Sequence, residues 1–146
     1  MTARVGKSLT VYLIEDDADH IILITRAIRD SGHDVTITTI DDSETAIPIL
    51  LAGEPPDLVL LDINMPGPSG FDVLRLIKSD AALKYVPVVM LTSSELMSDI
   101  GTAYELGASG YISKPSLMHD LKAVLGNTLL YWSAMRRPIQ GSMSEQ

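Results

Sequence analysis

The chain has 146 residues, no cysteine, a formal net charge of −8 at pH 7, and hydrophobic and charged contents of 46% and 21%. This length and composition are typical of one globular domain, and the lack of cysteine excludes disulfides, thiolate zinc sites and cysteine nucleophiles. The acidic balance argues against nucleic-acid binding, which depends on lysine and arginine.

The first predicted elements are a strand and a helix. Residues 11–14 form a compact apolar run that stops at three acids, which predicts a strand. Asp17 is a suitable N-cap for a helix of about fourteen residues, which should end at Ser31 and Gly32.

A second strand and a second helix are expected next. Residues 35–40 are β-branched almost throughout, a composition that favours a strand. The following helix should begin at Asp42 or Ser43. Pro48 lies inside that helical pattern and removes a backbone hydrogen bond, so we expect it to distort the helix.

The stretch that carries the most information is the apolar run 58–61, which leads directly into Asp62. A short, wholly apolar run bounded by turn residues predicts a strand buried on both faces of a parallel sheet. Asp62 would then lie at the carboxyl end of that strand, where open α/β sheets bind their ligands. Local sequence leaves three roles open for its carboxylate: metal ligand, nucleophile, or cap of the next turn.

The second half of the chain continues the alternation of helices and strands. We expect helices over 71–79 and 95–106, strands over 87–91 and 110–113, and a last helix capped by Ser116 that runs past Trp132. Five strands alternating with five helices predict an α/β protein with a doubly wound parallel sheet. We expect one domain over residues 8–136 and a flexible tail over 137–146.

Polar side chains follow the predicted strands at their carboxyl ends: Glu15, Asp16, Asp62, Thr92 and Lys114. The carboxyl ends of parallel strands meet at one edge of a sheet, so we expect these side chains to converge. Carboxylates this close would repel one another unless a cation lies among them, and hard oxygen ligands suit Mg²⁺. An aspartate beside a metal ion and a lysine can attack a phosphoryl group and form an aspartyl-phosphate.

In this order and spacing, these residues resemble the receiver domain of two-component response regulators. The resemblance extends from about Leu9 to Tyr131, and Asn64 and Gly70 follow Asp62 at the spacing of that family. It implies a flavodoxin-like, five-stranded sheet with the strand order 2-1-3-4-5, an order known for this family.

The resemblance also implies roles for single residues in phosphorylation. Asp62 would accept a phosphoryl group from a phosphohistidine on a partner histidine kinase. Asp16 and Asp62 would bind Mg²⁺ directly, Glu15 would act through water, and the backbone carbonyl of Asn64 would complete the protein ligands.

Three further residues would read out the phosphorylation. Lys114 would pair with phosphoryl oxygens, Thr92 would hydrogen-bond the phosphoryl group, and Tyr111 would repack inward behind it. The resemblance also implies a cis peptide bond between Lys114 and Pro115. His20, His33 and His119 lack metal-ligand spacing, so we expect them at the surface, with His20 near the acidic edge.

The last helix carries more apolar residues than one core-facing stripe requires. It either extends the core under the sheet or forms a self-association face, and we favour the second interpretation. Receiver domains often dimerise through the fourth helix, fifth strand and fifth helix. A homodimer of that kind would use Ile100, Tyr104, Leu117, Leu121, Leu125 and Trp132.

The resemblance implies a cytoplasmic, single-domain response regulator that signals through protein contacts, with no membrane or nucleic-acid partner and no enzymatic role beyond slow self-dephosphorylation. Residues 91–132 are similar to short regulators paired with bacterial phytochrome histidine kinases. One alternative is a haloacid-dehalogenase-type phosphatase, although Asn64 stands where its second acid would be. The other is a phosphorylation-independent adaptor, which the retained acids, Thr92 and Lys114 disfavour.

Overall fold

The computed structural model describes residues 8–138 of the chain. The strands are β1 (Leu9–Ile14), β2 (Val35–Ile40), β3 (Leu58–Leu61), β4 (Val88–Thr92) and β5 (Gly110–Ser113). The helices are α1 (Ala18–Asp30), α2 (Ser43–Ala52), α3 (Gly70–Ser79), α4 (Met97–Glu105) and α5 (Met118–Ala134). All neighbouring strands pair in parallel in the order β2-β1-β3-β4-β5, which confirms the predicted fold class and strand order.

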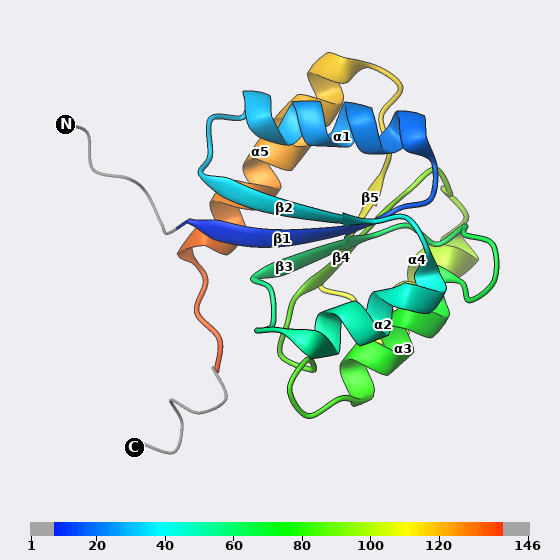
Figure 1. Ribbon diagram of the computed structural model, residues 1–146. Helices are drawn as coiled ribbons and strands as arrows, with labels where there is room; N and C mark the ends of the chain where they lie inside the picture. The colour runs from blue at the N-terminus through cyan, green and yellow to red at the C-terminus, as the bar shows by residue number, and fades with distance from the viewer. Residues whose placement is uncertain (1–7, 139–146) are drawn as a thin grey trace.

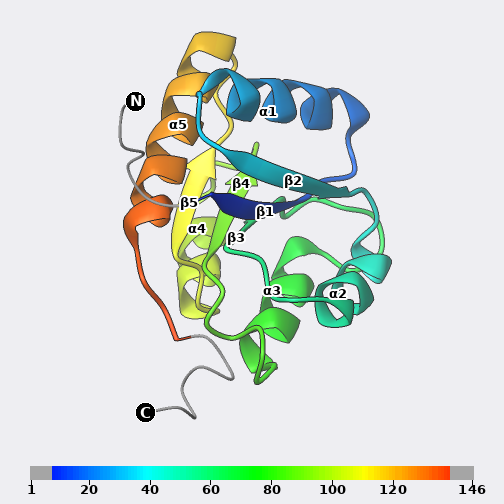
Figure 2. The same ribbon diagram turned by 60° about the vertical axis from the view of Figure 1, so that its left-hand side comes forward.

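The helices cover the sheet in two layers. Helices α1 and α5 lie side by side on one face, and α2, α3 and α4 lie on the other (Figures 1 and 2). Because each layer buries the apolar stripe of its helices against the sheet, the molecule has two hydrophobic clusters separated by the strands.

Strand β3 lies at the centre of the sheet and supplies side chains to both clusters. Leu58 and Leu60 pack into the layer of α1 and α5, whereas Val59 and Leu61 pack into the layer of α2, α3 and α4. All four side chains are fully buried, as a strand covered on both faces requires. The chain leaves this central strand at Asp62, so the position of that carboxylate is set by the most buried part of the sheet.

Local capping explains where two helices begin. The carboxylate of Asp17 accepts hydrogen bonds from the backbone N–H groups of Asp19 and His20, so the predicted N-cap of α1 is confirmed. Helix α3 begins with a capping box, in which Ser69 and Asp72 each accept a bond from the backbone of the other.

Two local predictions are wrong, and the distortion expected at Pro48 stays a prediction. Helix α5 begins at Met118 after Leu117, without a side-chain cap, so Ser116 does not cap it. Helix α2 continues through Pro48 to Ala52, because a proline removes one backbone hydrogen bond while the helix still packs its buried residues into the core. The bond between Lys114 and Pro115 is trans, like every other peptide bond in the part of the chain that the structure describes.

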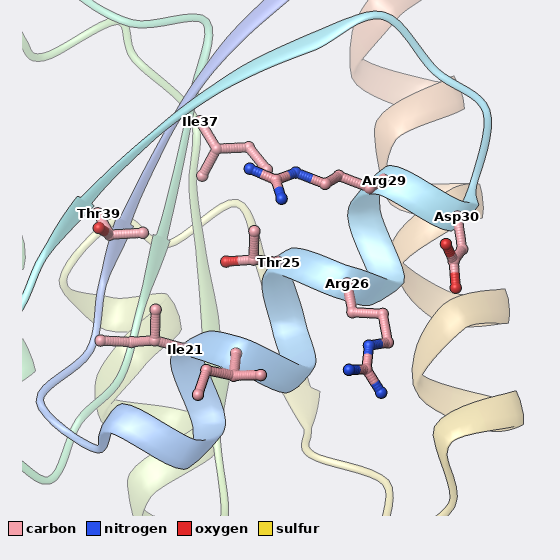
Figure 3. Close-up of a pocket in the computed structure, with 8 residues that line it drawn as sticks. Ile21, Thr25, Arg26, Arg29, Asp30, Ile37 and Thr39 are labelled. Atoms are coloured by element: carbon pink, nitrogen blue, oxygen red, sulfur yellow. The ribbon is translucent and has the colours of Figure 1, made fainter.

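Two pockets lie at the surface of the sheet. The first, of about 510 Å³, lies between α1 and β2 and is lined by residues such as Thr25, Arg29 and Ile37 (Figure 3). None of the predicted site residues lines it. The second, of about 450 Å³, is lined by β5 and α5, with Tyr111 and Trp132 on its walls. Among residues 8–138, no helix is both long and apolar enough to cross a membrane.

Candidate functional site

The loops at the carboxyl ends of β1 and β3 bring three carboxylates together. Oxygen atoms of Glu15, Asp16 and Asp62 lie within 4.8 Å of one another. Glu15 and Asp62 are buried, with exposed fractions of 1% and 6%, whereas Asp16 is exposed. The site is therefore an acidic pocket that is open on the side of Asp16.

Lys114 places one ammonium group in this pocket. Its backbone N–H donates to the carbonyl oxygen of Thr92 at 2.7 Å, which holds the residue at the end of β5 beside β4. The ammonium group donates to Oε1 of Glu15 and lies 3.5 Å from Oδ2 of Asp62. Glu15 and Asp62 thus share one ammonium group, and with Asp16 beside them negative charge remains in excess.

The electrostatics of Glu15 reflect this excess. Burial raises the pKa of its carboxyl group, and the neighbouring charge of Asp62 raises it further, while Lys114 and the backbone N–H of Asp17 act in the opposite direction. A bound divalent cation would offset both causes of the raised pKa.

The residues present therefore fit Mg²⁺, which prefers hard oxygen ligands. Glu15, Asp16 and Asp62 offer carboxylate oxygens, and Asn64, two residues after Asp62, is exposed. The backbone N–H of Asn64 donates to Oδ1 of Asp62 at 3.4 Å, so this turn also orients the Asp62 carboxylate.

Gly70 explains how the turn after Asp62 closes. Its backbone N–H donates to the carbonyl oxygen of Ile63 at 2.8 Å, which brings the start of α3 against the end of β3. A methyl group at this position would overlap the carbonyl oxygen of Asp62 and lie 2.8 Å from its carbonyl carbon. Only glycine allows this approach.

Thr92 and Tyr111 are linked through the loop that follows β4. Thr92 is fully buried, and its hydroxyl accepts a hydrogen bond from the backbone N–H of Ser94 at 3.5 Å. The hydroxyl of Tyr111 donates to the carbonyl oxygen of Ser94 at 3.0 Å. Burial raises the pKa of the Tyr111 hydroxyl, which favours the protonated form that donates this bond.

His20 lies near the acidic edge, as expected, but its contact with Lys114 was not predicted. Its side chain is 36% exposed, and its Nδ1 atom lies 2.9 Å from Nζ of Lys114. A signal was present in the sequence. His20 is the third residue of a helix capped by Asp17, and helical side chains lean toward the N-terminus, which here points at the acidic pocket.

The predicted interface residues differ in how exposed they are. Tyr104 and Leu117 are exposed, and Ile100 and Trp132 are half-buried. Leu121 and Leu125 lie in the core with α1 and the sheet, so their assignment to an interface is wrong. Helix α5 is apolar around most of its circumference, so the sequence alone did not define which of its sides packs against the sheet.

Comparisons with known proteins place the chain in a family. Residues 11–126 match the model of the response regulator receiver domain family. The chain is 35% identical over 125 residues to the chemotaxis protein CheY-3 of Vibrio cholerae, which covers 86% of this chain and 95% of the relative.

Two solved structures of response regulators are also similar. The phosphorylated cyanobacterial phytochrome response regulator RcpA is 34% identical, with a TM-score of 0.82 and coverage of 90% of this chain and 99% of its own. The Mn²⁺-bound form of response regulator Rcp1 is 28% identical, with a TM-score of 0.80 and coverage of 89% and 99%. This chain belongs to the response regulator receiver domain family of two-component signalling proteins.

Proposed function

We propose that this protein is a response regulator that accepts a phosphoryl group on Asp62 from a partner histidine kinase and signals through protein contacts. The observation that carries the proposal is the position of the Asp62 carboxylate, which lies among two further carboxylates and 3.5 Å from the ammonium group of Lys114. Phosphoryl transfer depends chiefly on positioning and on charge neutralisation, and this pocket offers both.

In the proposed transfer, a carboxylate oxygen of Asp62 forms a bond to phosphorus while the phosphorus–nitrogen bond of the donor phosphohistidine breaks. The electron pair of that bond stays on the imidazole nitrogen of the kinase. Lys114 neutralises charge on the phosphoryl oxygens from inside the pocket. When bound by Glu15, Asp16, Asp62 and the carbonyl of Asn64, Mg²⁺ would supply the remaining positive charge.

The structural response to phosphorylation would involve the loop after β4. A phosphoryl group on Asp62 would accept a hydrogen bond from the hydroxyl of Thr92, and the backbone N–H of Ser94, which donates to that hydroxyl, would follow its movement. Because the carbonyl of Ser94 also accepts from Tyr111, a shift of this loop would release the tyrosine and let it repack inward. Phosphorylation of Asp62 would thereby change the surface formed by α4 and β5.

We further propose a phytochrome-type histidine kinase as the partner, supported by the likeness to RcpA. For self-association we propose the face of α4, β5 and α5, with Ile100, Tyr104, Leu117 and Trp132 as its remaining candidates. The receiver domain over residues 8–136 and the tail over 137–146 stay predictions, and the tail lies outside the described residues from position 139 onward.

The test compares the wild type with Asp62→Asn, which keeps the size of the side chain but removes the nucleophilic carboxylate. The wild type should gain one phosphoryl group from acetyl phosphate and Mg²⁺, or from a phosphorylated phytochrome-type kinase, as followed by intact-mass spectrometry. The variant should gain none. Persistent labelling of Asp62→Asn would place the acceptor elsewhere, and steady turnover of a phosphomonoester would identify a phosphatase instead.

A further inference from the structure

The contact between His20 and Lys114 joins helix α1 to the acidic pocket. Nδ1 of His20 lies 2.9 Å from Nζ of Lys114, and because a lysine ammonium group can only donate hydrogen bonds, Nδ1 is the acceptor in this contact. Nδ1 also lies 3.7 Å from Oε1 of Glu15, and Nε2 lies 3.8 Å from Oδ2 of Asp17, so the ring is held between the pocket and the cap of the helix.

The three N–H groups of the Lys114 ammonium have three possible acceptors in the pocket. These are Oε1 of Glu15, Oδ2 of Asp62 at 3.5 Å and Nδ1 of His20 at 2.9 Å. Glu15 and Asp62 are carboxylates, which cancel positive charge as they bind it. His20 fixes the position of the ammonium group without reducing its charge, and it does so from a different element, helix α1.

We infer that His20 is a positioning residue for phosphoryl acceptance, which holds the ammonium group of Lys114 beside Asp62 through its Nδ1 atom. The inference rests on the proposed function and names a residue that the family pattern of acids, threonine and lysine does not include. Without this acceptor the ammonium group, still bonded to Glu15, would be free to turn away from an incoming phosphoryl group. Loss of one hydrogen bond to a charged group should slow the reaction roughly 10-fold.

Three substitutions separate this role from simple packing. In His20→Asn the amide oxygen can occupy the place of Nδ1, whereas in His20→Gln the amide lies one carbon further along, near the place of Nε2. His20→Leu fills a similar volume but accepts no hydrogen bond. Because the side chain is 36% exposed, all three variants should fold.

The experiment measures the rate constant of phosphorylation by acetyl phosphate over a series of Mg²⁺ concentrations, with time-resolved intact-mass spectrometry. We expect the maximum rate to fall roughly 10-fold in His20→Leu and His20→Gln, and to stay within about twofold of the wild type in His20→Asn. The Mg²⁺ concentration at half-maximum rate should not change. A packing role would give a different order, with the smallest residue, asparagine, the most damaged.

Three results would overturn the inference: a wild-type rate in His20→Leu, an asparagine variant as slow as the leucine variant, or an effect confined to the Mg²⁺ concentration required. A wild-type protein that is not phosphorylated at Asp62 would overturn the proposed function and this inference with it. A reactive wild type with unaffected His20 variants would overturn the inference alone.

Discussion

Glu15 shows how a single residue can trade stability for function. Its side chain is buried beside Asp62, and the raised pKa means that the folded protein holds the proton of Glu15 more tightly than the unfolded chain does. The stabilisation by protonated Glu15 is present below its ordinary value of 4.5 and is lost as the pH rises through the raised pKa. At neutral pH the ionised carboxylate is therefore held in the pocket at a cost to stability.

We expect Glu15→Gln to raise the melting temperature of the metal-free protein at pH 7, because glutamine removes the buried charge. The difference from the wild type should shrink as the pH is lowered toward 4.5, where Glu15 itself is increasingly protonated. Mg²⁺ should raise the melting temperature of the wild type more than that of the variant, because ligands stabilise the state that binds them. Calorimetry from pH 4 to 8 measures all three, and a lower melting temperature for the variant at pH 7 would show that the ion pair with Lys114 outweighs burial.

At Gly70 we expect a substitution to lower the stability of the protein. Gly70→Ala should destabilise the protein by about 2–3 kcal/mol, since the added methyl group meets the backbone of Asp62 and neither side can move without disturbing the sheet. Gly101→Ala, in the exposed part of α4, meets nothing within 4 Å and should stabilise the protein by about 0.5–1 kcal/mol. Urea denaturation measures both changes, and equal effects of the two substitutions would contradict the close approach at Gly70.

At the scale of the element, the start of α1 combines a structural and a functional task. Asp17 caps the helix, and the cap sets the position of His20 three residues later. The two bonds from backbone N–H groups also lower the pKa of the Asp17 carboxyl group, so this contribution to stability is lost as the pH falls through the lowered pKa.

Asp17→Ala should destabilise the protein by about 1 kcal/mol, because two backbone N–H groups lose their acceptor. Asp17→Asn should remain within a few tenths of a kcal/mol of the wild type, since asparagine is an equally good N-cap. Chemical denaturation at pH 7 compares the two variants. A large loss in the asparagine variant would mean that the negative charge, rather than the cap, carries the effect.

The ends of elements also show what could be predicted from sequence. Asp17 was identified because an acid before an amphipathic stretch needs no information from the rest of the fold. Ser116 has the same local pattern but does not cap α5, because the path of the loop after Lys114 decides where that helix begins. Capping was thus predictable where local chemistry alone sets the helix start.

At the scale of the whole molecule, the convergence of the acids with Lys114 was predictable because each residue follows a strand directly, whereas the strand order came from the resemblance to receiver domains. Parallel pairing then brings the strand ends together without further information. The exclusion of Leu121 and Leu125 from an interface, and the contact of His20, were not predicted. Both depend on how far a helix is rotated about its own axis. The neighbouring residues in the sequence do not define that rotation.

Self-association through α4, β5 and α5 is a prediction at this scale. Leu117 is 62% exposed on the proposed face, whereas Leu76 is 51% exposed on α3. We expect Leu117→Glu to lower the dimer fraction at least tenfold, because a charge in an apolar contact remains unpaired, and Leu76→Glu to leave it unchanged. Sedimentation velocity at several concentrations, with and without beryllofluoride and Mg²⁺, measures this. A wild type that is monomeric under all conditions would remove the proposed face.

The position of Trp132 has a practical consequence. It is the single tryptophan of the chain, its ring stands edge-on to Tyr131 with centroids 4.9 Å apart, and it lines the same pocket as Tyr111. Indole emission is sensitive to the polarity around the ring, so an inward movement of Tyr111 would change the colour and intensity of the protein's own fluorescence. The molecule thus carries a built-in optical probe, with which activation can be followed in real time without a dye.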